Sequence, residues 1–233
     1  LPLLDALLLN DPKPPAYLEA WEQGKAFCRE QQALARRGEC NNLVGLIANS
    51  VDGGQLDDDE MMAMMVVLLI GGVSTLAGAA AACLLNLAQN PDIAARIREE
   101  PHLADAHLEE SLRLDPPVSL VLRFAVRDVE IGGRTIPAGM PVYAMIAVAC
   151  HDPATFPDPY RFDPTRTNAK AHLAFGHGIH TCIGNTVTRM IAPLIIRKVA
   201  ARFPDLRQAG GDSVVWDVGT PRARHLKHLM LSV

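Results

Sequence analysis

The stretch FGHGIHTCIG, residues 175–184, is the most informative part of this chain, because it places one cysteine, Cys182, among three glycines. Cys182 stands where a glycine-rich loop gives way to a helical pattern, and exposed N–H groups and the helix dipole at such a place favour an anionic sulfur. Gly176, Gly178 and Gly184 carry no side chain, so a flat, bulky ligand can approach the backbone closely. The stretch therefore indicates a sulfur with a chemical role.

Three other interpretations of Cys182 need to be weighed. A structural zinc site needs four ligands, and only His180 stands close enough in sequence to add a second one. A nucleophilic cysteine needs a histidine base and a group that orients it, and His177 and His180 keep that alternative open. A buried, inert cysteine would leave the three glycines unexplained.

Composition limits the class of protein. The chain has 233 residues, 49% of them hydrophobic, which is enough for a sizeable core in one domain or two small ones. A net charge of -4 and an aromatic content of 5% argue against nucleic acid as a partner. Five cysteines without a CxxC pair suit a reducing compartment, and residues 1–15 lack the basic start of a signal peptide. We therefore expect a cytoplasmic protein.

Periodicity predicts a mainly helical fold with small β-sheets. Helical patterns cover residues 17–38, 43–50, 61–89, 91–100, 103–114 and about 183–203. Alternating patterns predict strands in residues 118–126 and 129–146 and a hairpin in residues 213–233. Residues 151–166 form a loop held by prolines.

The longest helical pattern, Met61 to Gln89, carries no charged residue. Such a run is long enough to cross a membrane. It is rich in glycine and alanine, however, and lacks an aromatic belt. We therefore expect the buried central helix of a large helical domain and no membrane partner.

The stretch 175–184 resembles, at every defining position, the heme-binding signature of the cytochromes P-450, the heme-thiolate monooxygenases. Three further elements precede this stretch, in the same order as in that family: GGVST at 71–75, the Glu-x-x-Arg pair within EESLRLDPP at 109–117, and FPDPYRF at 156–162. The resemblance runs from about Tyr17 to the C-terminus. It implies the cytochrome P-450 fold without its usual N-terminal helical portion, as a single heme-thiolate domain over residues 1–233 with an apolar, proline-rich lead-in at 1–16.

The resemblance also implies a cofactor, heme b (iron protoporphyrin), and residues that hold it. Cys182 resembles the axial thiolate, which pushes electron density to the iron and favours O–O cleavage. Phe175 would pack near the sulfur, and His180 and Arg123 would bind the heme propionates. The predicted cofactor-binding residues are Phe175, Gly176, His180, Cys182, Gly184 and Arg123.

Two further sets of residues follow from the resemblance. Glu110, Arg113 and Arg161 would form a buried ion network that fixes the loop carrying Cys182, without taking part in the chemistry. An apolar substrate pocket would be lined by Leu68, Gly71, Gly72, Val73, Leu76, Val118, Leu120 and Val121.

The chain departs from the family at Ser74, where an acid usually precedes the groove threonine, here Thr75. Acid and threonine relay protons in the family, and a hydroxyl passes a proton through water but cannot supply one as a carboxylic acid does. The first expectation is an oxygenase of secondary metabolism, which inserts an oxygen atom from O₂ into a small apolar molecule with electrons from a ferredoxin-type partner.

Two alternatives stay open beside that expectation. One is a heme-thiolate protein with non-oxygenase chemistry, such as rearrangement, cyclisation or peroxide use, and Ser74 motivates it. The other is a non-enzymatic accessory subunit. We also expect that a partner or a second copy covers the distal face of the heme.

Overall fold

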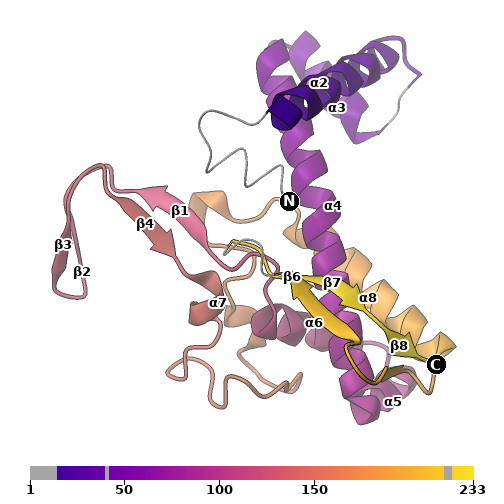
Figure 1. The fold of residues 1–233 in the computed structure, drawn as a ribbon. Coiled ribbons are helices and arrows are strands. Elements are labelled where there is room, and N and C mark those ends of the chain that lie inside the picture. Colours follow the sequence, from indigo (N-terminus) through magenta and orange to yellow (C-terminus); the bar gives the residue numbers. More distant parts are fainter. Residues whose placement is uncertain (1–14, 40–41, 218–221) are drawn as a thin grey trace. The chain divides into compact units, whose positions relative to one another are not determined.

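The computed structural model of the chain describes residues 15–39, 42–217 and 222–233. Most of the predicted lead-in, residues 1–14, therefore lies outside the described residues. The chain divides into two compact units, with the boundary between Ser74 and Thr75. Figure 1 colours the elements in chain order, and each unit is described by itself.

The first unit consists of α2 (Pro15–Arg36), α3 (Leu43–Asp52) and the first part of α4 (Asp58–Gln89). The start of α4 is capped reciprocally: the Glu60 N–H donates to Asp57 Oδ1 at 2.8 Å, and the Asp57 N–H donates to Glu60 Oε2 at 3.0 Å. The core of this unit consists of Cys28, Ala35, Ile47, Ala48, Met61, Met62, Met65 and Val66.

The second unit packs α5 (Pro91–Glu99), α6 (Leu103–Leu114) and α8 (Asn185–Arg202) around the C-terminal part of α4. Small residues on these helices let their backbones approach closely. The core consists of Ala79, Cys83, Leu87, Ala88, Ala94, Ile97, Ala104, Leu108, Leu112, Ala192, Ile196, Ala200 and Leu206. This core fixes α6 against α8, and the two helices between them hold the site described below.

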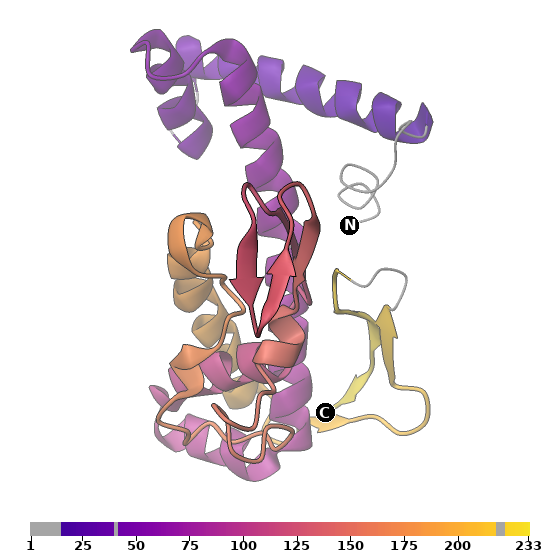
Figure 2. The same cartoon turned by 90° about the vertical axis from the view of Figure 1, so that its left-hand side faces the viewer.

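The described strands form two-stranded antiparallel sheets. Figure 2 shows the β1–β4 pair separated from the C-terminal β6–β7 hairpin. The pairs are β1 (Val121–Phe124) with β4 (Pro141–Ala144), β2 (Val129–Ile131) with β3 (Arg134–Ile136), β5 (Arg207–Gln208) with β8 (Leu231–Ser232), and β6 (Val214–Asp217) with β7 (His225–Leu229). Short turns complete the unit: α7 (Ile146–Ala149), η1 (Ala169–Ala171) and η2 (Gly178–His180).

The predicted fold class, mainly α with small β-sheets, is confirmed. Helix α6 has the predicted bounds, and the other helix ends lie within a few residues of their predicted positions. Helix α7 and the β5–β8 pair were not predicted, because two- to four-residue elements have no period of their own. The expectation of a buried central helix holds for only part of α4: Cys83 and Leu87 are buried, but Val67 and Val73 are 65% and 69% exposed. By length and composition α4 could also cross a membrane.

Candidate functional site

Cys182 lies in a tight loop between Phe175 and the start of α8. Its N–H donates to the carbonyl oxygen of Phe175 at 2.8 Å, and its own carbonyl oxygen accepts from the side-chain amide of Asn185 at 2.5 Å. Gly176 and Gly178 have φ of 70° and 74°, in the left-handed region that favours glycine. Both backbone polar groups of Cys182 are therefore held, while its thiol is exposed.

The surroundings of Cys182 fit a flat apolar group that takes one sulfur ligand. A Cβ added at Gly178 would meet no atom within 4 Å, so this glycine leaves open space beside the backbone. Ile179 and Ile183, close to Cys182 in sequence, are 98% and 83% exposed, and exposed apolar side chains that lie together mark a binding surface. Among the described residues, no group of three or more His, Cys, Asp or Glu side chains could hold a metal ion. The donor set suits a heme better than a protein-ligated zinc.

The other predicted cofactor residues lie in the second unit. His180, at the end of η2, is exposed, and so is Arg123 on β1, whose Nη1 donates to the Leu122 carbonyl oxygen at 2.8 Å. Phe175 is half-buried, and a Cβ added at Gly184 would lie 3.7 Å from Cys182 Sγ. These residues remain predicted heme contacts.

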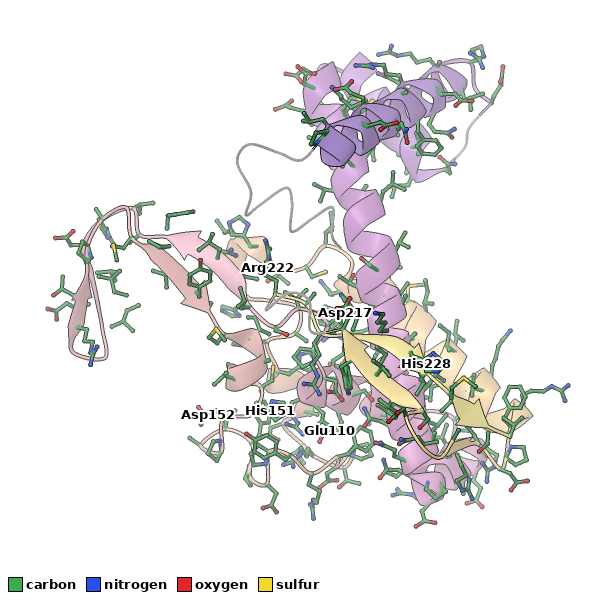
Figure 3. The ribbon with its side chains drawn as sticks, in the orientation of Figure 1. Glu110, His151, Asp152, Asp217, Arg222 and His228 are labelled. Carbon is green, nitrogen blue, oxygen red and sulfur yellow. The ribbon has the colours of Figure 1, made fainter. Side chains whose placement is uncertain are left out.

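Glu110 and Arg113 come together in a buried ion pair on α6, and both side chains are fully buried. Arg113 Nε donates to Glu110 Oε2 at 2.8 Å, and Arg113 Nη1 donates to the carbonyl oxygens of Cys150 and Pro159 at 3.0 and 2.7 Å. Figure 3 marks Glu110 on α6, beside the looped segment that follows α7. A buried charge needs such partners, and here they tie residues 150–166 to α6.

The third member of this network is Arg166, and the prediction of Arg161 was wrong. Arg166 Nε donates to Glu110 Oε1 at 3.1 Å, whereas the largely exposed Arg161 side chain pairs with Asp163 at 2.6 Å. Arg161 contributes only its carbonyl oxygen, which accepts from Arg113 and Arg166. The resemblance of residues 156–162 to the family's Pro-x-Arg-Phe element favoured Arg161, but its side chain is turned outward from the loop.

The predicted substrate-pocket residues fall in both units. Leu68, Gly71, Gly72 and Val73 belong to the first unit, and Leu76, Val118, Leu120 and Val121 belong to the second. None of them lines the cavity of about 310 Å³ beside the Cys182 loop or the cavity of about 590 Å³ between Tyr160 and Trp216. Ser74 and Thr75 follow one another on α4 and are half-buried. The pocket and the relay remain predictions.

Comparison with known proteins points to one family. The model of the family described as cytochrome P450 matches residues 24–206, which is more than half of the chain. The solved structure of ligand-free Mycobacterium smegmatis CYP164A2 superposes with a TM-score of 0.88 at 31% identity, over 100% of this chain and 61% of that one.

Two curated relatives are similar to more than half of the chain. The cytochrome P450 monooxygenase PikC of Streptomyces venezuelae is 43% identical over 145 residues, 61% of this chain and 34% of the relative. The 6-deoxyerythronolide B hydroxylase of Saccharopolyspora erythraea is 40% identical over 131 residues, 56% of this chain and 32% of the relative. The matched segment spans about a third of the length of these relatives.

Proposed function

Because the chain belongs to the cytochrome P450 family, we propose that it forms the thiolate side of a heme monooxygenase. Family membership implies heme as the cofactor. The observation that carries the proposal is the exposed Cys182 thiol, whose backbone is fixed at both polar groups in a glycine loop. A heme bound here would supply the activation of O₂, and a thiolate ligand favours O–O cleavage.

The proposed reaction is the one that the names of the monooxygenase and hydroxylase relatives describe in those proteins. One oxygen atom of O₂ enters a C–H bond of a small apolar molecule, and the other leaves as water after taking two electrons and two protons. The electrons come from a ferredoxin-type donor in the cytoplasm. The name of one relative, 6-deoxyerythronolide B hydroxylase, describes such a hydroxylation in that protein and supports a secondary-metabolite substrate for this one.

Named residues have distinct roles in the proposal. Cys182 binds the iron, Phe175 limits the access of water to the sulfur, and His180 and Arg123 bind the propionates through charge-assisted hydrogen bonds. Glu110, Arg113 and Arg166 hold the segment that leads to the Cys182 loop.

The ligand assignment is tested by spectroscopy. The reduced protein with carbon monoxide is expected to show the strongly red-shifted Soret band of a thiolate-ligated heme. The Cys182→Ala variant should lose that band, whereas Cys28→Ala, which removes a buried thiol in the first unit, should keep it. A band that persists in Cys182→Ala would overturn the assignment.

Ser74 sets the rate of proton delivery in this proposal. The hydroxyls of Ser74 and Thr75 pass protons through water, which is slower than transfer from a carboxylic acid. Ser74→Glu is expected to raise the donor-coupled turnover by about tenfold or more. Turnover supported by hydrogen peroxide, which brings its own oxygen atom, electrons and both protons of the water that leaves, should change less. An unchanged donor-coupled rate in Ser74→Glu would exclude this relay.

A further inference from the structure

A second buried carboxylate, Glu109, precedes Glu110 on α6 and has its own partners. Consecutive residues on a helix point about 100° apart, so the two carboxylates face different segments of the chain. Glu110 faces residues 150–166, as described above. The side chain of Glu109 is only 5% exposed and faces His172 and Arg189, which flank the Cys182 loop on its two sides.

Both partners bind the Glu109 carboxylate directly. Arg189 Nε and Nη2 donate to its two oxygens at 2.6 and 3.1 Å, the paired geometry in which guanidinium and carboxylate interact most strongly. His172 Nε2 lies 3.1 Å from Glu109 Oε2. One carboxylate thus bridges two residues that are separated in sequence by the whole loop.

The hydrogen bonds fix the tautomer of His172. Its Nδ1 accepts from the Ala174 N–H at 3.1 Å and therefore carries no proton, so Nε2 is the protonated nitrogen and donates to Glu109. Burial acts to raise the pKa of Glu109, but the hydrogen bonds from His172 and Arg189, together with the charges beside the carboxylate, outweigh it and lower the pKa to about 2. The Glu109 carboxylate thus accepts hydrogen bonds from two side chains, the His172 ring and the Arg189 guanidinium.

Arg189 connects this cluster to both backbone groups of Cys182. Its Nη1 donates to Asn185 Oδ1 at 3.4 Å, and the amide of Asn185 donates to the Cys182 carbonyl oxygen. Its guanidinium also lies 4.6 Å from the centre of the Phe175 ring, and the Phe175 carbonyl oxygen accepts from the Cys182 N–H. Arg189 therefore contacts both of the residues that hold the Cys182 backbone.

We propose that Glu109 is a positioning residue that sets the place of the Cys182 sulfur through Arg189 and His172. The role in heme ligation rests on the proposed function, but the effect on the loop itself does not. Without the Glu109 charge, Arg189 loses its anchor, and the contacts of Phe175 and Asn185 with the Cys182 backbone lose their support.

Hydrogen exchange of the purified full chain tests the proposal without using activity. In Glu109→Gln the amides of residues 173–184 are expected to exchange about tenfold faster or more, because a charged hydrogen-bonding partner is lost. The control is Asp105→Asn, which removes another ion pair between the same two helices, at Arg197 and away from the loop. Exchange in residues 173–184 should be unchanged in this control.

A second variant covers the case in which Glu109→Gln does not fold. Arg189→Lys affects a partly exposed side chain, keeps its charge and loses the paired geometry and the contact with Phe175. It should also speed exchange in residues 173–184. Loop exchange that matches the wild type in both variants would overturn the proposal, as would faster exchange spread evenly over the second unit.

The carbon monoxide complex provides an independent measurement. In Glu109→Gln a smaller fraction of the bound heme should show the red-shifted thiolate band than in the wild type or in Asp105→Asn. An equal fraction in all three would show that Glu109 does not act on the position of the Cys182 sulfur. If instead Cys182→Ala keeps the band, the ligand assignment fails while the exchange result on the loop still stands.

Discussion

At the residue scale, Gly78 on α4 is the glycine with the clearest packing reason. A Cβ added there would lie 2.5 Å from Nδ1 and 3.2 Å from Cε1 of His225 on β7. The first distance is far shorter than a van der Waals contact. The missing side chain is what lets the C-terminal hairpin lie against α4 within the second unit.

Replacement of Gly78 by alanine should therefore destabilise the protein. We expect Gly78→Ala to lower the free energy of unfolding by about 1–3 kcal/mol, the usual cost of overpacking. The matched control on the same helix is Gly72→Ala, where an added Cβ meets no atom within 4 Å. That change should raise stability by about 0.5–1 kcal/mol, because alanine loses less backbone entropy in a helix. Equal denaturant midpoints for the two variants would contradict the packing argument.

The outcomes at single residues show what a sequence pattern can predict. The ten-residue stretch around Cys182 predicts a glycine loop before a helix, because glycine and the helical period are local signals, and both are found. Arg166 was missed because a side chain in an irregular loop turns inward or outward with the backbone path, as at Asp158, whose φ is 49°. No spacing rule encodes that path.

At the scale of elements, α6 is both the best-predicted helix and the one whose partners were least predictable. Pro116 and Pro117 end its pattern, so its bounds follow from sequence. Of its twelve residues, eight are buried, including Glu109, Glu110 and Arg113. Buried charged side chains are rare without partners, so each of the adjacent glutamates, Glu109 and Glu110, needs its own set of hydrogen-bonding partners. Which segments supply the partners depends on tertiary packing, and the sequence alone left Glu109 without a role.

At the scale of the whole molecule, two buried groups make stability depend on pH. Burial lowers the pKa of His107 from 6.5 to about 4, because its ring lies inside the second unit with Nε2 2.9 Å from the Cys83 carbonyl oxygen. In this pH range His107 binds a proton in the unfolded chain but not in the folded chain, so the free energy of unfolding falls as pH drops from about 6.5 to 4. Glu109, with its pKa lowered from 4.5 to about 2, stays ionised after the unfolded chain has been protonated, so stability falls again below pH 4.5.

Unfolding free energies measured against pH separate the two groups. Each should contribute up to about 3 kcal/mol across its window. His107→Gln keeps a donor for Cys83 but cannot titrate, so it should flatten the curve between about pH 6.5 and 4 only. Glu109→Gln should flatten it only between about pH 4.5 and 2. Parallel curves for wild type and both variants would rule out this origin of the acid sensitivity.

The adjacent glutamates of α6 also determine where the chain tolerates a change of length. One residue inserted in α6 before Glu109 would rotate the following side chains by about 100°. Glu109 would then take the place of Glu110, and Glu110 would face neither set of partners, so an insertion there would disrupt both networks at once. The β2–β3 hairpin is different, because its strands are mostly exposed and its Gly132–Gly133 turn has positive φ at both positions. We therefore expect this turn to tolerate a change of length or a grafted peptide tag without an effect on the Cys182 loop.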